Sequence, residues 1–362
     1  MRTALFVIPS LAVGGTERVL LQLLQRLDRH RFRAELVVAD ASGPLRADVP
    51  ADVPILNLNQ ARTRNALPGL IRHIRQSRPD VALSFHGHLN LLLAMAEPLL
   101  PRKTRLLARE SCVPSLAIAH GRAPALMRLL YRLLYPRFER IVCQSADMRD
   151  DLAANFGLEP SRLAVIHNPV DGTRLRELAA SGPGPSPGGK RILAVGRLTR
   201  QKGFDLLLRA LARLDDPAAR LTILGEGPER GALVAQAARL GLAERVELPG
   251  FQPNPWSAMA QANVFALSSR YEGFPNALLE AQALGTPAVA LACPGGPNEI
   301  VIPGETGWLA PLADEETTVA GLAQAMTTAL AATLDREAIA RRTLERFGVE
   351  AIVRRYAALL EG

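Results

Sequence analysis

Short apolar runs alternate with segments of helical periodicity along most of the chain. In segments 17–27, 67–76 and 147–155, apolar residues recur at the three- and four-residue spacing of an amphipathic helix. Between such segments lie apolar runs that are typical of buried strands. Their repeated alternation predicts parallel sheets covered by helices on both faces. The predicted strands are 4–8, 34–39, 81–85, 105–108, 141–144 and 163–166 in the first half and 191–195, 221–224, 246–248, 264–267 and 288–291 in the second.

A segment built only of serine, glycine and proline divides this alternation at residues 181–189. Such a composition favours neither helix nor sheet, so it marks a linker. The sequence therefore predicts two Rossmann-like α/β domains with doubly wound parallel sheets, which face each other across a cleft at the carboxyl ends of their strands. The predicted parts are a first domain at 1–171, a linker at 172–190, a second domain at 191–334 and a C-terminal helical segment at 335–362, whose course back to the first domain the pattern leaves open.

Composition places the chain in a reducing compartment. At 362 residues and 48% hydrophobic content it is long enough and apolar enough for two cores. Its three cysteines are too widely spaced for a disulfide framework or a zinc site. The apolar start is interrupted by Pro9 and leads into Gly14, so it is interpreted as a first strand and not a signal peptide. We expect a cytoplasmic protein, either soluble or peripheral on the inner face of the cell membrane.

The net charge of +8 suggests an anionic partner, which is either nucleic acid or a membrane surface. No run of basic residues interleaved with aromatic residues is present, so nucleic acid is not expected. Residues 120–138 combine arginines with leucine, methionine, tyrosine and phenylalanine at helical spacing. This pattern suits a helix on an anionic bilayer. A core-facing helix with an arginine-rich solvent face fits it equally well.

The most informative loop joins the predicted strand 264–267 to a helix that begins near Asn276. Unpaired backbone amides gather at such a helix start, where the helix dipole is positive. Glu272 lies in the loop, and Glu280 lies about one turn into the helix. A carboxylate among free amides is well suited to hold polar hydroxyl groups. The sequence therefore predicts a sugar-binding site here.

Two further strand-end loops have the residues of a phosphate site. Arg197 and Lys202 flank a loop after the first strand of the second domain, where a guanidinium fork and a lysine charge suit a diphosphate. The Gly-Lys-Ser/Thr ending of the nucleotide P-loop is absent. Gly14 and Gly15 permit close approach of the backbone to a phosphate at a helix start. Solvated loop charges and a simple glycine turn are the respective alternatives.

Taken together, these loops resemble the retaining glycosyltransferases of family 4, which have the two-domain GT-B fold. The resemblance runs from Gly14 to Leu309. The variant at 272–276, followed by 293–300, is similar to the subset that builds lipid-linked oligosaccharides and surface polysaccharides by hexosaminyl or galactosyl transfer, often from UDP-sugars. The densest match comprises Gly196-Arg197, Lys202 to Asp205, Gly225 to Arg230, Gly250-Phe251, Tyr271 to Asn276, and Glu280.

The resemblance implies a metal-independent retaining enzyme without a cofactor. Its donor would be a nucleotide sugar, namely a UDP-linked hexose or N-acetylhexosamine, and its acceptor would be lipid-linked or a polysaccharide. It implies that Arg197 and Lys202 stabilise the departing diphosphate, that Glu272 binds the transferred sugar and that Glu280 binds the ribose. The implied catalytic residues are Glu272, Arg197 and Lys202, and the implied donor-binding residues are Gly15, Arg197, Lys202, Phe251, Glu272, Gly273, Phe274, Asn276 and Glu280.

The resemblance also implies that the first domain holds the acceptor. Polar residues at two predicted strand ends are candidates for contact with the acceptor or the sugar. At the first strand end lie His86 and His88, for which a structural or surface role fits equally well. At the end of the following strand, Arg109 and Glu110 are the second candidate. Two other functions remain open for the same architecture. A nucleotide-sugar epimerase would turn over its substrate without an acceptor, and a non-catalytic nucleotide-sugar-binding protein would bind without turnover.

Overall fold

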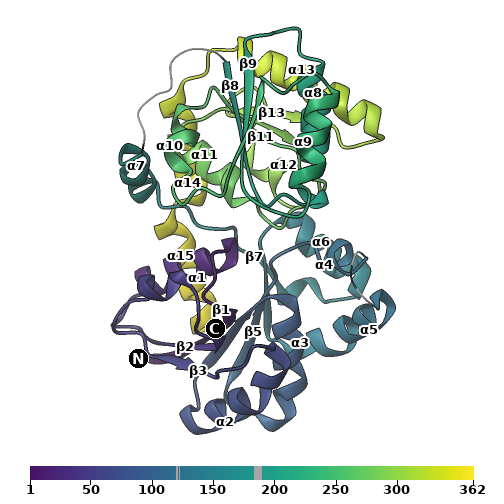
Figure 1. Cartoon of the computed structure of the whole chain (residues 1–362). Helices are drawn as coiled ribbons and strands as arrows, with labels where there is room; N and C mark the ends of the chain where they lie inside the picture. The colour runs from purple at the N-terminus through teal and green to yellow at the C-terminus, as the bar shows by residue number, and fades with distance from the viewer. Residues whose placement is uncertain (120, 122, 183–189) are drawn as a thin grey trace. The chain divides into compact units, whose positions relative to one another are not determined.

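The computed structural model describes residues 1–119, 121, 123–182 and 190–362. The predicted linker is therefore outside the described residues at 183–189. The chain forms two compact units (Figure 1). The first comprises Met1–Pro169 together with Val349–Gly362, and the second comprises Val170–Gly348.

A seven-stranded parallel sheet forms the centre of the first unit, in the order β3-β2-β1-β4-β5-β6-β7. Its strands are β1 Arg2–Ser10, β2 Phe32–Asp40, β3 Ile55–Asn57, β4 Val81–Phe85, β5 Arg105–Arg109, β6 Arg140–Cys143 and β7 Leu163–Val165. Its helices are α1 Gly15–Arg26, α2 Leu67–Ser77, α3 Gly87–Ala96, α4 Pro114–Ala119, α5 Pro124–Leu134, α6 Ala146–Phe156 and α15 Val349–Glu361, with short 3-10 helices η1 Pro44–Asp48, η2 Thr63–Ala66, η3 Glu97–Leu99, η4 Tyr135–Arg137 and η5 Pro160–Arg162.

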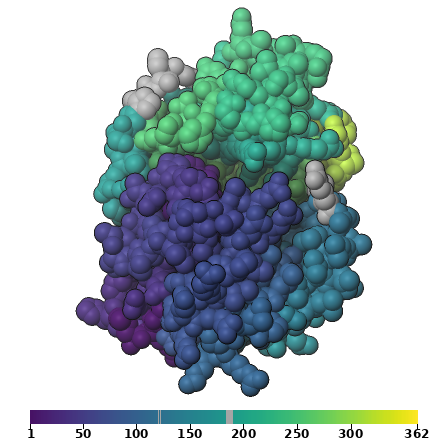
Figure 2. All heavy atoms as spheres, turned by 60° about the horizontal axis from the view of Figure 1, so that its bottom comes forward, coloured from purple at the N-terminus to yellow at the C-terminus, as the bar shows by residue number. Residues whose placement is uncertain are grey.

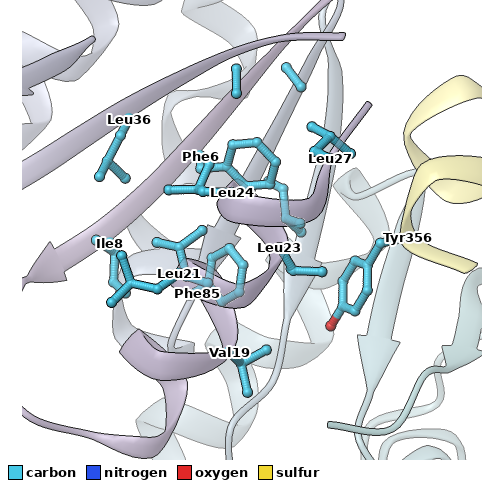
Figure 3. Close-up of a cluster of buried hydrophobic side chains, with 14 of the residues drawn as sticks. Phe6, Ile8, Val19, Leu21, Leu23, Leu24, Leu27, Leu36, Phe85 and Tyr356 are labelled. Atoms are coloured by element: carbon cyan, nitrogen blue, oxygen red, sulfur yellow. The ribbon is translucent and has the colours of Figure 1, made fainter. Parts of the chain in front are cut away.

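Both faces of this sheet are buried, which explains the continuous apolar runs of its central strands. Successive side chains of a strand point to opposite faces. Phe6 and Ile8 of β1 therefore join the apolar layer beneath α1, while Leu5 and Val7 join the layer on the other face. Figure 3 shows Phe6 and Ile8 among the leucines of α1. In Figure 2 the atoms of this unit, coloured purple to blue, form a continuously packed surface.

The last helix of the chain, α15, belongs to the first unit. Its Tyr356 is 1% exposed and lies in the same apolar layer as α1 (Figure 3). Arg105 of β5 donates a hydrogen bond from Nη1 to the carbonyl oxygen of Leu360 at 2.8 Å. The preceding helix, α14 (Arg336–Phe347), remains in the second unit. The predicted segment 335–362 is therefore divided between the two units.

A six-stranded parallel sheet, in the order β10-β9-β8-β11-β12-β13, forms the centre of the second unit. Its strands are β8 Lys190–Val195, β9 Ala219–Leu224, β10 Val246–Gly250, β11 Val264–Leu267, β12 Ala288–Leu291 and β13 Gly307–Ala310. Its helices are α7 Gly172–Ala180, α8 Phe204–Ala212, α9 Arg230–Arg239, α10 Trp256–Gln261, α11 Asn276–Ala283, α12 Pro297–Ile300, α13 Glu315–Ala331 and α14, with η6 Arg200–Lys202.

Part of the segment predicted as a linker is a helix. Residues 172–180 form α7, whose start is capped by Asp171 through a hydrogen bond from the backbone N–H of Arg174 to Oδ1 at 3.1 Å. Such a cap satisfies a backbone donor that the helix leaves unpaired. Leu175 is 6% exposed and packs in the core of the second unit. These two features, and not the glycine- and proline-rich segment that follows, determine the structure here.

Candidate functional site

The predicted phosphate and sugar loops of the second unit meet backbone to backbone. All of them follow strands of one parallel sheet, so they lie together at the carboxyl ends of its strands. Gly225 after β9 has a φ of +149°, and a Cβ there would collide with the carbonyl oxygen of Gly196 after β8. Gly295 after β12 has a φ of +97°, and a Cβ there would collide with the carbonyl oxygen of Glu272 after β11. Only glycine permits both approaches.

Lys202 and Glu272, which come from two of these loops, form an ion pair. Lys202 Nζ lies 2.6 Å from Glu272 Oε1. Ser269 Oγ donates a second hydrogen bond to the same oxygen at 2.6 Å. Glu272 is 6% exposed, and its backbone N–H bonds the carbonyl oxygen of Pro294 at 3.0 Å. The structure therefore brings together a cation and a carboxylate that the motifs assigned to the diphosphate and to the sugar.

Arg270 stabilises the loop that contains Lys202, a role that sequence reasoning missed. Its guanidinium binds both carboxylate oxygens of Asp205 at 2.8 and 2.7 Å and donates to the carbonyl oxygen of Arg200 at 2.8 Å. Although burial opposes it, the hydrogen bonds and charge of Arg270 lower the pKa of Asp205. Bidentate pairs of this kind fix geometry. Arg197, by contrast, is exposed at the start of the loop.

The side chain of Glu280 is held by an aromatic residue on α10. Trp256 Nε1 donates a hydrogen bond to Glu280 Oε2 at 2.8 Å. Trp256 carried no signal in the sequence because a tryptophan 24 positions away shares no motif with the glutamate. Phe251, after β10, is 55% exposed. Phe274 is only 5% exposed and packs edge-on against Phe347 with ring centroids 5.4 Å apart, so its side chain supports the loop from within.

The remaining predicted donor residues have different settings. Gly273 is buried and Asn276 is half-buried where α11 begins. Gly15 begins α1, in the first unit.

In the part of the chain that the structure describes, no three His, Cys, Asp or Glu side chains are grouped to hold a metal ion. Among the same residues, no helix combines the length and apolar character that crossing a bilayer requires.

In the first unit, His86 lies between two polar residues from neighbouring strand ends. Its Nε2 is 3.3 Å from Glu17 Oε1, and its Nδ1 is 3.4 Å from Ser111 Oγ. The imidazole of His88 stacks on it at 5.8 Å between ring centroids. Burial and the adjacent His86 lower the pKa of His88. Glu17 was not predicted to contact His86, since 69 residues separate them.

Glu110 lines a pocket, whereas Arg109 does not reach the surface. Glu110 is 3% exposed and accepts hydrogen bonds from Tyr135 Oη and, at 3.1 Å, from Asn90 Nδ2. Burial raises the pKa of its carboxyl group, against the effect of these donors. The pocket beside it has a volume of about 320 Å³ and apolar walls from α4 and α5. Its polar lining includes His88, Glu110 and Ser111.

The expectation that Arg109 contacts an acceptor is not supported. The residue is fully buried, with Nε donating to Tyr356 Oη at 3.0 Å and Nη2 donating to Asn168 Oδ1 at 2.6 Å. Its guanidinium also lies over the Phe85 ring, 5.4 Å from the centroid. Arg109 therefore joins β5 to α15 inside the first unit.

Comparison with known proteins places both halves of the chain in glycosyltransferase families. Residues 13–174 match the model for Glycosyltransferase Family 4, and residues 180–343 match the model for Glycosyl transferases group 1. The N-acetylgalactosamine-N,N'-diacetylbacillosaminyl-diphospho-undecaprenol 4-alpha-N-acetylgalactosaminyltransferase of Campylobacter jejuni is 31% identical over 330 residues, which cover 87% of each chain. The lipopolysaccharide core biosynthesis glycosyltransferase LpsE of Rhizobium meliloti is 28% identical over 96% of each chain.

Solved structures give the same result for the fold. Anabaena HepE in complex with UDP has a TM-score of 0.79 to this chain at 21% identity, with all of both chains covered. The resemblance inferred from the loop motifs is confirmed, as is the fold class with its two parallel-sheet domains. The chain belongs to the family 4 glycosyltransferases and has the GT-B fold.

Proposed function

We propose that this enzyme transfers a hexose or N-acetylhexosamine from a UDP-sugar to a lipid-linked or polysaccharide acceptor, with retention of anomeric configuration and without a metal ion. The observation that carries the proposal is the Lys202–Glu272 ion pair, with Nζ and Oε1 2.6 Å apart in adjoining strand-end loops. Support for the substrates comes from the names of similar proteins, which include a transferase acting on a diphospho-undecaprenol acceptor and a structure with bound UDP.

Donor binding would exchange the partners of this pair. A diphosphate carries more negative charge than one carboxylate, so it competes well for Lys202, and the exposed Arg197 adds a second cation. Glu272 would then accept hydrogen bonds from hydroxyl groups of the transferred sugar. Ser269 remains to hold its carboxylate in place. The two charges of the pair therefore acquire separate roles only when the donor is bound.

The nucleoside would bind beside α10 and α11. Glu280 accepts hydrogen bonds from the ribose hydroxyls, in an orientation fixed by Trp256. The exposed ring of Phe251 offers a face for the base. The amides of Gly273 and Asn276 would hold the sugar and the phosphate near the start of α11. We also propose that the backbone N–H of Gly15 contacts the distal phosphate.

The proposed chemistry is attack by the acceptor on the face that the leaving group vacates. The bond from the anomeric carbon to the phosphate oxygen breaks, and its electron pair remains on UDP. The acceptor oxygen forms the new bond to the same carbon, and its proton passes to the released phosphate oxygen. Arg197 and Lys202 neutralise the charge that develops there. Glu272 is not assigned as a nucleophile, because in this proposal its carboxylate binds hydroxyl groups of the sugar while Ser269 holds it in place.

We further propose that α5 binds an anionic membrane surface. Leu126, Leu129 and Leu133 project outward with exposures of 54, 52 and 62%, and Arg128 and Arg132 are exposed beside them. Tyr131 and Leu134 of the same helix are buried. α5 is therefore a core-facing helix that also carries an exposed apolar and basic strip. His120 and Arg122, at the start of the predicted segment, lie outside the described residues.

The test of this function is a survey of nucleotide sugars with the purified enzyme and a lipid-linked N-acetylhexosamine acceptor, with and without a chelator of divalent cations. We expect consumption of a UDP-sugar, a product whose NMR spectrum shows the anomeric configuration of the donor, and the same rate with chelator. Turnover of the UDP-sugar to its epimer without an acceptor would contradict transfer. An inverted product would contradict retention, and loss of activity with chelator would contradict metal independence.

A further inference from the structure

His86 has polar side chains on both sides and an unusual backbone conformation, neither of which an isolated surface histidine requires. Glu17, His86 and Ser111 follow three neighbouring strands of the first sheet, β1, β4 and β5. Glu17 is 8% exposed. The Glu17 carboxylate lies against the backbone of Gly14, where a Cβ would displace it. The backbone of His86 has a φ of +81°, which a residue with a side chain rarely adopts.

The chemistry of these three groups determines where the hydrogens lie. An ionised carboxylate only accepts hydrogen bonds. His86 Nε2, 3.3 Å from Glu17 Oε1, must therefore carry a hydrogen in order to donate to it. When the ring is neutral, Nδ1 is then the acceptor, and Ser111 Oγ, 3.4 Å away, is placed to donate its own hydrogen to it.

We propose that Ser111 Oγ is the group that receives a hydroxyl of the acceptor sugar, and that Glu17 and His86 are positioning residues that keep its lone pairs available. With its hydrogen directed to His86, the serine oxygen offers only lone pairs to a ligand. Ser111 lines the pocket of about 320 Å³ beside Glu110, so the proposed ligand position is in that pocket. The site would thus select a ligand group that donates a hydrogen bond, which is a sugar hydroxyl.

The identity of the ligand rests on the proposed transfer function, whereas the tautomer of the His86 ring does not. Nitrogen-15 NMR of ring-labelled enzyme, with the His86 signals assigned by their loss in His86→Asn, should show Nδ1 without hydrogen and Nε2 with hydrogen. In Glu17→Ala we expect a shift toward the Nδ1-protonated ring. The opposite tautomer in the unsubstituted enzyme, or the same spectrum in Glu17→Ala, would overturn the proposal.

Kinetics test the role of the serine. We expect Ser111→Ala to raise the acceptor KM about tenfold, as loss of one hydrogen bond implies, with the donor KM unchanged. Ser111→Thr keeps the hydroxyl group and should restore much of the affinity. Glu17→Ala should raise the acceptor KM in the same direction. An unchanged acceptor KM in Ser111→Ala would overturn the assignment.

A second glutamate–histidine pair in the same unit provides the control. Glu35 Oε2 lies 3.5 Å from His73 Nε2, and both side chains have the same exposures as Glu17 and His86, 11 and 24%. Glu35→Ala should therefore remove similar contacts without changing the acceptor KM. An equal increase in Glu35→Ala would show a general loss of structure and overturn the proposal. If the unsubstituted enzyme transfers no sugar at all, the proposed function fails, and the NMR result alone decides on the tautomer.

Discussion

At the scale of single residues, the proposed donor site is held in place by contacts between its own charged groups. Glu272 is buried and satisfied by Lys202 and Ser269, so the carboxylate does not remain unpaired in the interior. A buried ion pair of this kind contributes little to stability by itself, because desolvation offsets its attraction. We therefore attribute the pair to substrate binding.

Trp256 allows a test of one contact in the nucleoside site. Trp256→Phe keeps an aromatic ring but removes the Nε1 hydrogen bond to Glu280. Because Glu280 then loses the partner that orients it, we expect the donor KM to rise about tenfold with little change in kcat. Steady-state kinetics with the preferred UDP-sugar measures both quantities.

The matched control is the second tryptophan of the chain, Trp308 in β13. Trp308→Phe makes the same substitution at a half-buried residue in the edge strand of the same sheet. We expect its donor KM to remain unchanged. An unchanged KM in Trp256→Phe would be incompatible with the proposed role of the indole, as would an equal rise in Trp308→Phe.

At the scale of helices and strands, the apolar pattern predicted the central strands and two of the four edge strands, β7 and β10. β1, β4, β8 and β11 are covered on both faces, so they appear as continuous apolar runs. β3 and β13 were missed. Both are at sheet edges, where short strands of three and four residues are only partly buried and have little apolar signal. α7 was missed because the serine, glycine and proline residues that follow it led to the assignment of the whole segment 172–190 as a linker.

Among the helices, α5 carries a prediction about membrane binding. The double substitution Arg128→Glu and Arg132→Glu reverses two exposed charges. Because each arginine near an anionic surface contributes about 1 kcal/mol, we expect affinity for phosphatidylglycerol vesicles to fall at least about tenfold. Sedimentation with vesicles of phosphatidylglycerol and of phosphatidylcholine measures this effect.

The control for the membrane experiment is a double charge reversal on another exposed helix. Arg174→Glu and Arg176→Glu on α7 change the net charge of the chain by the same amount. We expect that variant to sediment with anionic vesicles as the unsubstituted enzyme does. Equal losses in the two variants would reduce the effect to net charge, and failure of the unsubstituted enzyme to bind anionic vesicles would refute the role of α5.

At the scale of the whole molecule, the chain completes its first unit only with its last helix. The contacts of Tyr356 and Arg109 join residues 247 positions apart. Such contacts leave no periodic signal in a sequence, so the course of α15 could not be predicted, nor could the burial of Arg109. The same holds for the approach of Glu17 to His86. The sequence did predict the alternation of strands and helices, and the loops whose residue types suit phosphate and sugar groups.

The central claim is that Lys202 and Glu272 together form the donor site. The most direct measurement is the rate of UDP-sugar consumption by Lys202→Ala and Glu272→Ala, with Lys190→Ala as the matched lysine control. Lys190 is in the same unit, where it forms an ion pair with Asp216 at 2.9 Å and is 48% exposed. We expect both site variants to lose about a hundredfold or more in kcat/KM, while Lys190→Ala retains full activity. Full turnover in either site variant would contradict the account.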